Sequence, residues 1–263
     1  MRILHLYYDL MNLYGDWANA AVLVRELEAR GHSVVLDKKS VGDDIDFDSC
    51  DLVYIGSGTE RSQRECLRNI SKHKDALFAK INDGMHVLAT GNSHEMFGRW
   101  IRKTDGEAYE ALGLLDFETM QENSRVTGDC VCKATFLEEK LVGFINRAGG
   151  GQKGSVERPF HLEFGQGLSD DSRAEGVKFK NFLGTYMTGP ILVRNPPLLM
   201  HIADAISVHN VDDCRQGQEA GDIRPCSDGI SDGAARSRPD PLFGYLEKAY
   251  KSALSELSLR SSL

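Results

Sequence analysis

Apolar and polar positions along the first half of the chain follow two alternating periods. The segment 16–31 has apolar residues at the three-to-four spacing of an amphipathic helix, and the segment 60–82 is a second, more charged helix. Short apolar runs with the composition of buried strands separate these helices, at 2–8, 32–37, 51–58 and 86–90. Strands that alternate with helices predict a parallel sheet covered by helices, which is an α/β fold.

The second half of the chain has a different pattern. Successive strand-like runs from residue 114 predict an antiparallel extension, and the glycine-rich segment 148–155 predicts a loop or hairpin tip, without the spacing of a phosphate-binding loop. A strand, a turn and a helix that begins near Pro196 follow. We therefore predict a domain over 1–210, a polar linker over 211–240 and a C-terminal helix over 241–263. The apolar face of that helix is expected at positions 245, 249, 253 and 257.

Composition and charge narrow the classes of protein without identifying one. A net charge of −8 gives no electrostatic reason to expect nucleic acid or an anionic membrane as a partner. No apolar run reaches the length of a membrane helix, and the N-terminus does not resemble a secretory signal. The six cysteines contain no C-x-x-C pair, and no Cys/His set completes a site around Cys130 and Cys132. We expect reduced thiols, no metal, no cofactor and a cytoplasmic location.

The stretch "HVLATGNSHEMFG" at 86–98 is the strongest candidate for chemistry. It combines a buried strand, a sharp turn and the predicted start of a helix over 94–102. Many enzymes place a nucleophile on such a turn. The turn contains Gly91, Asn92 and Ser93, and His94 and Glu95 follow it.

Three segments together resemble a known family. They are 86–98, "YIGSGTERSQ" at 54–63 and "GTYMTGP" at 184–190, and they occur in order within a resemblance that spans about residues 1–208. They resemble the class-I (triad) glutamine amidotransferases, in the cobyric-acid-synthase-like branch. Within that branch they are most similar to the GatD subunits of lipid II isoglutaminyl synthase. This resemblance implies a flavodoxin-like α/β sandwich, mostly parallel, with an antiparallel extension.

The resemblance also implies a catalytic cysteine on the turn and a histidine base, and this chain has neither. Alignment on Gly98 puts Gly91 at the cysteine position, and Thr188 stands at the histidine position. Glycine has no side chain that could attack an amide carbon. A threonine hydroxyl does not titrate near neutral pH and cannot act as the base. We therefore predict that no catalytic dyad is intact.

Other features of the family's pocket are expected to remain. The family has a backbone oxyanion donor at the strand end containing Gly58, and the Asn92 N–H would be the second donor. Glycines also end strands without any such role. Arg125 falls where the family has an arginine near the active site, and it could equally be a surface residue. Glu95, in place of the family's glutamine, adds a negative charge. Ser93 is either a substitute nucleophile or an ordinary residue of the first helical turn.

Three hypotheses about function follow. In the first, the chain is a pseudoenzyme subunit of a MurT-like Mur ligase in peptidoglycan amidation, because a GatD subunit supplies ammonia to such a ligase. In the second, it is an active glutaminase with relocated residues, in cell-wall or cobalamin metabolism. In the third, it is a sensor that binds glutamine or another small amino acid in the remaining pocket.

Overall fold

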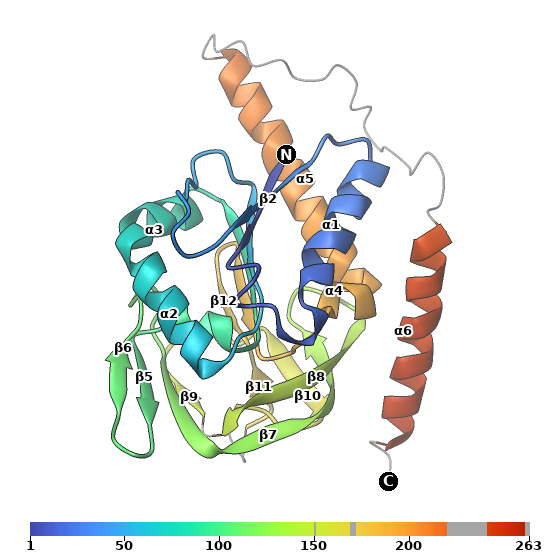
Figure 1. The fold of residues 1–263 in the computed structure, drawn as a ribbon. Helices are drawn as coiled ribbons and strands as arrows, with labels where there is room; N and C mark the ends of the chain where they lie inside the picture. Colours follow the sequence, from blue (N-terminus) through green and yellow to red (C-terminus); the bar gives the residue numbers. More distant parts are fainter. Residues whose placement is uncertain (150, 169–171, 220–240, 261–263) are drawn as a thin grey trace.

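A six-stranded sheet forms the centre of the molecule. The computed structural model describes residues 1–149, 151–168, 172–219 and 241–260 (Figure 1). The strand order is β12-β13-β4-β3-β1-β2, and every neighbouring pair is parallel except β12 and β13. The strands are β1 (Arg2–Leu6), β2 (Val35–Lys39), β3 (Leu52–Ile55), β4 (His86–Thr90), β12 (Val177–Phe179) and β13 (Phe182–Thr185).

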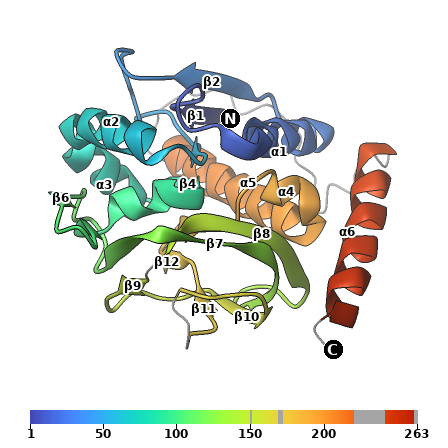
Figure 2. The ribbon, with the colours of Figure 1, turned by 60° about the horizontal axis from the view of Figure 1, so that its bottom comes forward.

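Helices cover both faces of this sheet, as the alternating pattern predicted. On one face lie α1 (Trp17–Ala29), α4 (Ile191–Arg194) and α5 (Pro196–Glu219). On the other lie α2 (Glu60–Ile70) and α3 (Lys74–Asn82), which a short 3₁₀ turn, η2 (Ser71–His73), joins (Figure 2). In β3, Leu52 and Tyr54 pack on the face covered by α1 and α5, whereas Val53 and Ile55 pack on the face covered by α2 and α3. Successive strand residues point to opposite faces of the sheet, and helices cover both faces. Every residue of β3 is therefore buried and apolar. The predicted α/β sandwich is confirmed.

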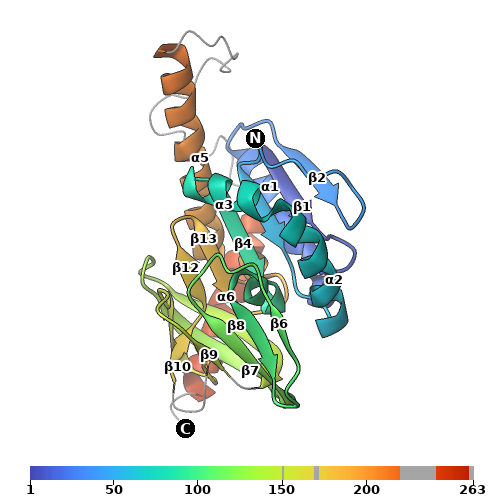
Figure 3. The same ribbon diagram turned by 90° about the vertical axis from the view of Figure 1, so that its left-hand side faces the viewer.

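A second, mostly antiparallel sheet follows the carboxyl end of β4, and it confirms the predicted extension. Its longest strand is β7 (Glu118–Ala134), which pairs with β8 (Lys140–Gly149) along almost its whole length. The shorter strands are β5 (Trp100–Lys103), β6 (Ala108–Glu110), β9 (Gln152–Lys153), β10 (Phe160–Phe164) and β11 (Ala174–Glu175). Figure 3 shows this sheet below the parallel sheet. The chain reaches it from β4 through two 3₁₀ turns, η3 (Gly91–Phe97), and a sharp change of direction.

One local prediction is wrong, and a second agrees with the structure only in part. Residues 94–102 do not form a helix, because η3 ends at Phe97 and β5 begins at Trp100. Pairing with β6 and β7 holds 100–103 extended, so long-range hydrogen bonds override the local pattern. The segment 148–155, predicted as a loop or hairpin tip, contains the end of β8 and all of β9, and its described residues 151, 154 and 155 lie outside helices and strands. β8 pairs with β7 as far as Gly149, and β9 pairs with the same strand at Gln152 and Lys153.

The C-terminal part differs from expectation in its boundaries. Helix α5 continues to Glu219, nine residues into the predicted 211–240 linker, and 220–240 lie outside the described residues. Helix α6 (Pro241–Arg260) forms as predicted; its expected last residues, 261–263, also lie outside that part. Of the expected positions, Leu257 is buried and Ala253 packs against the core, whereas Tyr245 is 70% exposed; Leu246 and Tyr250 are buried in the first half of the helix instead. Within the described residues, no helix is long and apolar enough to cross a membrane.

Candidate functional site

The turn after β4 has the backbone of a nucleophile elbow. β4 lies between β3 and β13, so its carboxyl end opens at the middle of the sheet. Gly91 follows directly and has φ +63°, in the left-handed region that favours glycine. The chain then turns into η3, whose residues are almost all buried. The fold therefore presents position 91 where a reactive side chain would stand.

Ser57 occupies the space in front of this turn. A Cβ built on Gly91 would lie 2.2 Å from Ser57 Oγ and 2.5 Å from Ser57 Cβ. Ser57 follows β3 and is buried. Its N–H donates to Asp16 Oδ2 at 2.6 Å, and burial raises the pKa of Asp16 to about 6. This contact could not be predicted from local sequence patterns, because 34 residues separate the two positions.

A cavity of about 190 Å³ lies beside the elbow. Four of the five residues predicted for the remaining pocket line it, namely Gly58, Asn92, Glu95 and Arg125. Ser93 is not among the lining residues. Its hydroxyl is buried within hydrogen-bond distance of two backbone carbonyls, those of Ile55 (3.0 Å) and Thr90 (2.8 Å). It therefore pairs with carbonyls, rather than with a free N–H of a helix. The remaining lining residues are Leu13, Tyr14, Ser57, Thr59, Glu60, Gln121, Asn146, Arg147 and Ala148.

Three donors hold the carboxyl group of Glu95 inside the cavity wall. Gln63 Nε2 donates to it at 2.8 Å, Gln121 Nε2 at 2.7 Å and Tyr186 OH at 2.8 Å. Burial raises the pKa of Glu95, and these hydrogen bonds act in the opposite direction. The carboxyl group of Glu95 is thus buried and hydrogen-bonded, so it belongs to the framework of the site. Gln121 and Tyr186 lie 26 and 91 residues from Glu95 in the chain, too far for a local pattern to find them.

His94 cannot serve as a base in this arrangement. It is completely buried, its Nδ1 lies 2.7 Å from the Gly91 carbonyl oxygen, and its Nε2 lies 2.9 Å from Gln152 Nε2. Burial lowers the pKa of His94 to about 3. The ring packs edge-on against Tyr186 with centroids 4.3 Å apart. His94 is therefore a neutral core histidine that contacts the backbone of the elbow at Gly91.

The expected oxyanion donor already has a partner. The Gly58 N–H donates to Asn92 Oδ1 at 3.0 Å, and the Asn92 carbonyl accepts from Gln63 Nε2. A substrate oxyanion would have to displace the Asn92 side chain in order to reach the Gly58 N–H. One of the two N–H groups predicted as oxyanion donors is therefore satisfied within the chain.

The outer part of the site contains the remaining predicted positions. Arg125 is half-exposed at the rim, where it pairs with Glu60 at 3.1 Å and donates to Asn146 Oδ1 at 2.9 Å. It thus both lines the cavity and belongs to the surface. Thr188, at the position of the family's histidine, is buried, and its hydroxyl donates to the Phe144 carbonyl at 3.1 Å. It does not line the cavity.

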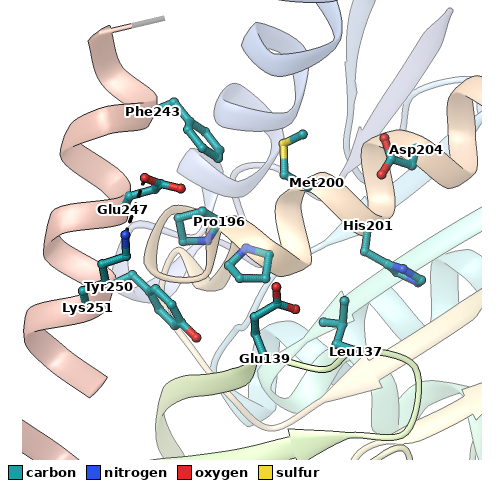
Figure 4. A pocket seen from close by; sticks show the side chains of 11 residues that line it. Leu137, Glu139, Pro196, Met200, His201, Asp204, Phe243, Glu247, Tyr250 and Lys251 are labelled. Atoms are coloured by element: carbon teal, nitrogen blue, oxygen red, sulfur yellow. Dashed lines mark ion pairs between the residues drawn. The ribbon is translucent and has the colours of Figure 1, made fainter. Parts of the chain in front are cut away.

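A larger cavity, of about 400 Å³, lies between α5 and α6. Figure 4 shows Phe243 and Tyr250 of α6 and Met200 of α5 around the same space. It shares no lining residue with the cavity at the elbow. Within the described residues, no three His, Cys, Asp or Glu side chains gather as metal ligands. The cavity at the elbow contains four of the predicted site residues, and the larger cavity contains none. The cavity at the elbow is therefore the candidate functional site.

Comparisons with known proteins agree with this geometry. The family model described as the CobB/CobQ-like glutamine amidotransferase domain matches residues 2–196, and the chain belongs to this family. Two curated relatives are GatD subunits of the glutamine-hydrolysing lipid II isoglutaminyl synthase. The protein from Staphylococcus aureus (strain N315) is 36% identical over 74% of this chain and 79% of its own length. The protein from Streptococcus pneumoniae (strain ATCC BAA-255 / R6) is 32% identical over 75% and 77%.

The solved structures support the fold alone. PurLQS from Thermotoga maritima matches with a TM-score of 0.51 at 16% identity, over 81% of this chain and 97% of the compared chain. The family model and the two GatD relatives, rather than this structure, confirm the family predicted from the three segments. The relatives' names describe glutamine hydrolysis, whereas this chain has Gly91 and Thr188 at the two positions where the resemblance predicts the catalytic cysteine and histidine.

Proposed function

We propose that this protein is a GatD-like subunit without glutaminase activity that works with a MurT-like Mur ligase in peptidoglycan amidation, in the cytoplasm. The observation that carries this proposal is the elbow. Gly91 supplies no nucleophile, and the candidates beside it are occupied: Ser93 by carbonyls and His94 by burial. Amide hydrolysis needs both a nucleophile and a group that protonates the departing ammonia.

The similarity to the two GatD subunits supports the partner. In the proposed complex this chain stabilises the ligase, and the ligase takes free ammonia from solution. The cavity at the elbow then remains as a pocket without covalent chemistry. Its buried Glu95 carboxyl group and its rim of Glu60 and Arg125 are features of this chain that a small ligand would encounter.

The test is ammonia release from glutamine by the purified chain, alone and with the Mur-ligase-like protein of the same organism. We expect no release above the enzyme-free background in either case. We also expect the two proteins to co-purify, and amidation by the complex to depend on ammonium chloride and not on glutamine. The Staphylococcus aureus GatD subunit with its own ligase is the positive control.

Each arm of this experiment can contradict a separate part of the proposal. Release of ammonia from glutamine would show that a relocated nucleophile acts, and the pseudoenzyme assignment would be wrong. Failure to co-purify, together with calorimetric binding of glutamine or another small amino acid to the chain alone, would favour a sensor instead. The partner assignment would then be withdrawn.

A further inference from the structure

The space that a nucleophile at position 91 needs is already filled. An added Cβ at Gly91 would meet Ser57 at 2.2 Å (Oγ), 2.5 Å (Cβ) and 3.2 Å (Cα). Real Cβ atoms do not approach other heavy atoms as closely as the first two distances. Rotation of the Ser57 side chain would move Oγ away but would leave its Cβ in place. Any side chain at 91 therefore requires Ser57 either to lose its own Cβ or to shift its backbone.

The backbone around Ser57 is held on several sides, so a shift is costly. The Ser57 N–H donates to the buried Asp16 carboxyl group at 2.6 Å, and its carbonyl accepts from the Leu13 N–H at 2.9 Å. The preceding residue, Gly56, is packed so closely that a Cβ there would lie 2.4 Å from the Met11 carbonyl oxygen. Two hydrogen bonds and the close packing of Gly56 therefore hold the backbone of Ser57 in place.

We propose that Ser57 takes the place of the missing nucleophile's side chain, so that positions 57 and 91 are coupled and a cysteine at 91 cannot act while position 57 keeps its Cβ. This proposal rests on the proposed loss of glutaminase activity and explains how the loss is maintained. The Asn92 side chain acts in the same direction at the neighbouring oxyanion donor, because it accepts the Gly58 N–H. Groups of this chain therefore occupy both the space beside Gly91 and the Gly58 N–H.

The first test is a double-mutant cycle on thermal stability. Gly91→Cys should lower the Tm by roughly 5–10 °C, through overpacking against Ser57 and the left-handed φ of position 91. Ser57→Gly should restore at least half of that loss, since it removes both close contacts. Ser57→Ala is the matched control: it removes Oγ but retains the Cβ, so it should restore little. Gly91→Ala carries the same Cβ without a thiol and should follow the same pattern.

The second test is alkylation of the introduced thiol by iodoacetamide, located by mass spectrometry of the peptide that contains position 91. In the Ser57→Gly background we expect alkylation at least tenfold faster than with Ser57 or Ala at position 57. If Gly91→Cys does not fold by itself, folding of the pair with Ser57→Gly, but not with Ser57→Ala, supports the same conclusion. An unchanged Tm and a reactive thiol in the single variant would overturn it.

These readouts are independent of the proposed function. Glutamine hydrolysis by the wild-type chain would contradict the pseudoenzyme assignment whatever the cycle shows. Additivity of the substitutions at 57 and 91 would contradict the coupling even if the wild type releases no ammonia.

Discussion

The buried carboxyl group of Glu175 should make the stability of this protein fall as the pH rises. Glu175 lies in β11 and is 1% exposed. Its Oε1 accepts the Tyr186 N–H at 2.6 Å, and its Oε2 accepts the Thr185 hydroxyl at 2.8 Å. Burial raises the pKa of Glu175 from 4.5 to about 7, although these hydrogen bonds lower it. Tyr186 in turn donates to Glu95, so Glu175 supports the wall of the candidate site.

The size of the effect follows from linkage. Below pH 4.5 the carboxyl group of Glu175 is protonated in both the folded and the unfolded chain. Between pH 4.5 and 7 only the unfolded chain releases the proton, so the free energy of unfolding falls. At about 1.4 kcal/mol per pH unit, the full loss is about 3 kcal/mol, or about 6–12 °C in Tm for a chain of this length.

Glu175→Gln isolates this contribution. The amide has nearly the same shape, its oxygen can still accept the Tyr186 N–H, and it does not titrate. We expect the Tm of the variant minus that of the wild type to increase between pH 4.5 and 8 and then to level off. Scanning fluorimetry over this range measures the difference and cancels the contributions of the other titrating groups.

A surface carboxyl group provides the control of opposite sign. Hydrogen bonds from Lys140 and Lys133 lower the pKa of Glu163, so its contribution to stability is lost as the pH falls. The Tm of Glu163→Gln relative to wild type should therefore decrease with rising pH through the acid range. A pH-independent difference for Glu175→Gln, or a decrease, would refute the assignment of a buried, protonated Glu175.

Asn195→Ala and Leu246→Ala test how the C-terminal helices contact the rest of the chain, and Tyr245→Ala is the control for the second. Asn195→Ala should lower stability by about 2–4 kcal/mol in chemical denaturation, because the buried side chain accepts the Val142 N–H and donates to the Val142 and Ile191 carbonyls, each at 2.8 Å; an effect below about 1 kcal/mol would contradict this. Leu246→Ala should cost about 2–3 kcal/mol by opening the contact of α6 with the core, whereas Tyr245→Ala, 70% exposed on the same helix, should change stability by less than about 0.5 kcal/mol. Equal effects would mean that α6 does not dock as the structure shows.

The alternating periods of the sequence were sufficient for the layered fold, because each period depends on residues that are close together in the chain. The strand β3 and the helix α1 appear within a few residues of their expected places, whereas the single helix predicted over 60–82 is divided into α2 and α3 by the turn η2. The prediction was wrong where pairing with distant strands decides the conformation. Residues 100–103 join a sheet, and Gly149 and the segment 152–153 both pair with β7.

The same distinction, between what local sequence determines and what distant segments determine, applies to the candidate site. That Gly91 and Thr188 cannot perform the family's chemistry follows from the types of side chain alone, and no fold could supply what glycine lacks. Only the tertiary structure reveals that Ser57 fills the space in front of Gly91, that Asn92 accepts the Gly58 N–H, and that three residues distant in the chain donate to Glu95. The physical reason is that chemical capability belongs to a residue, whereas occupied space and hydrogen-bond partners depend on segments that folding brings together.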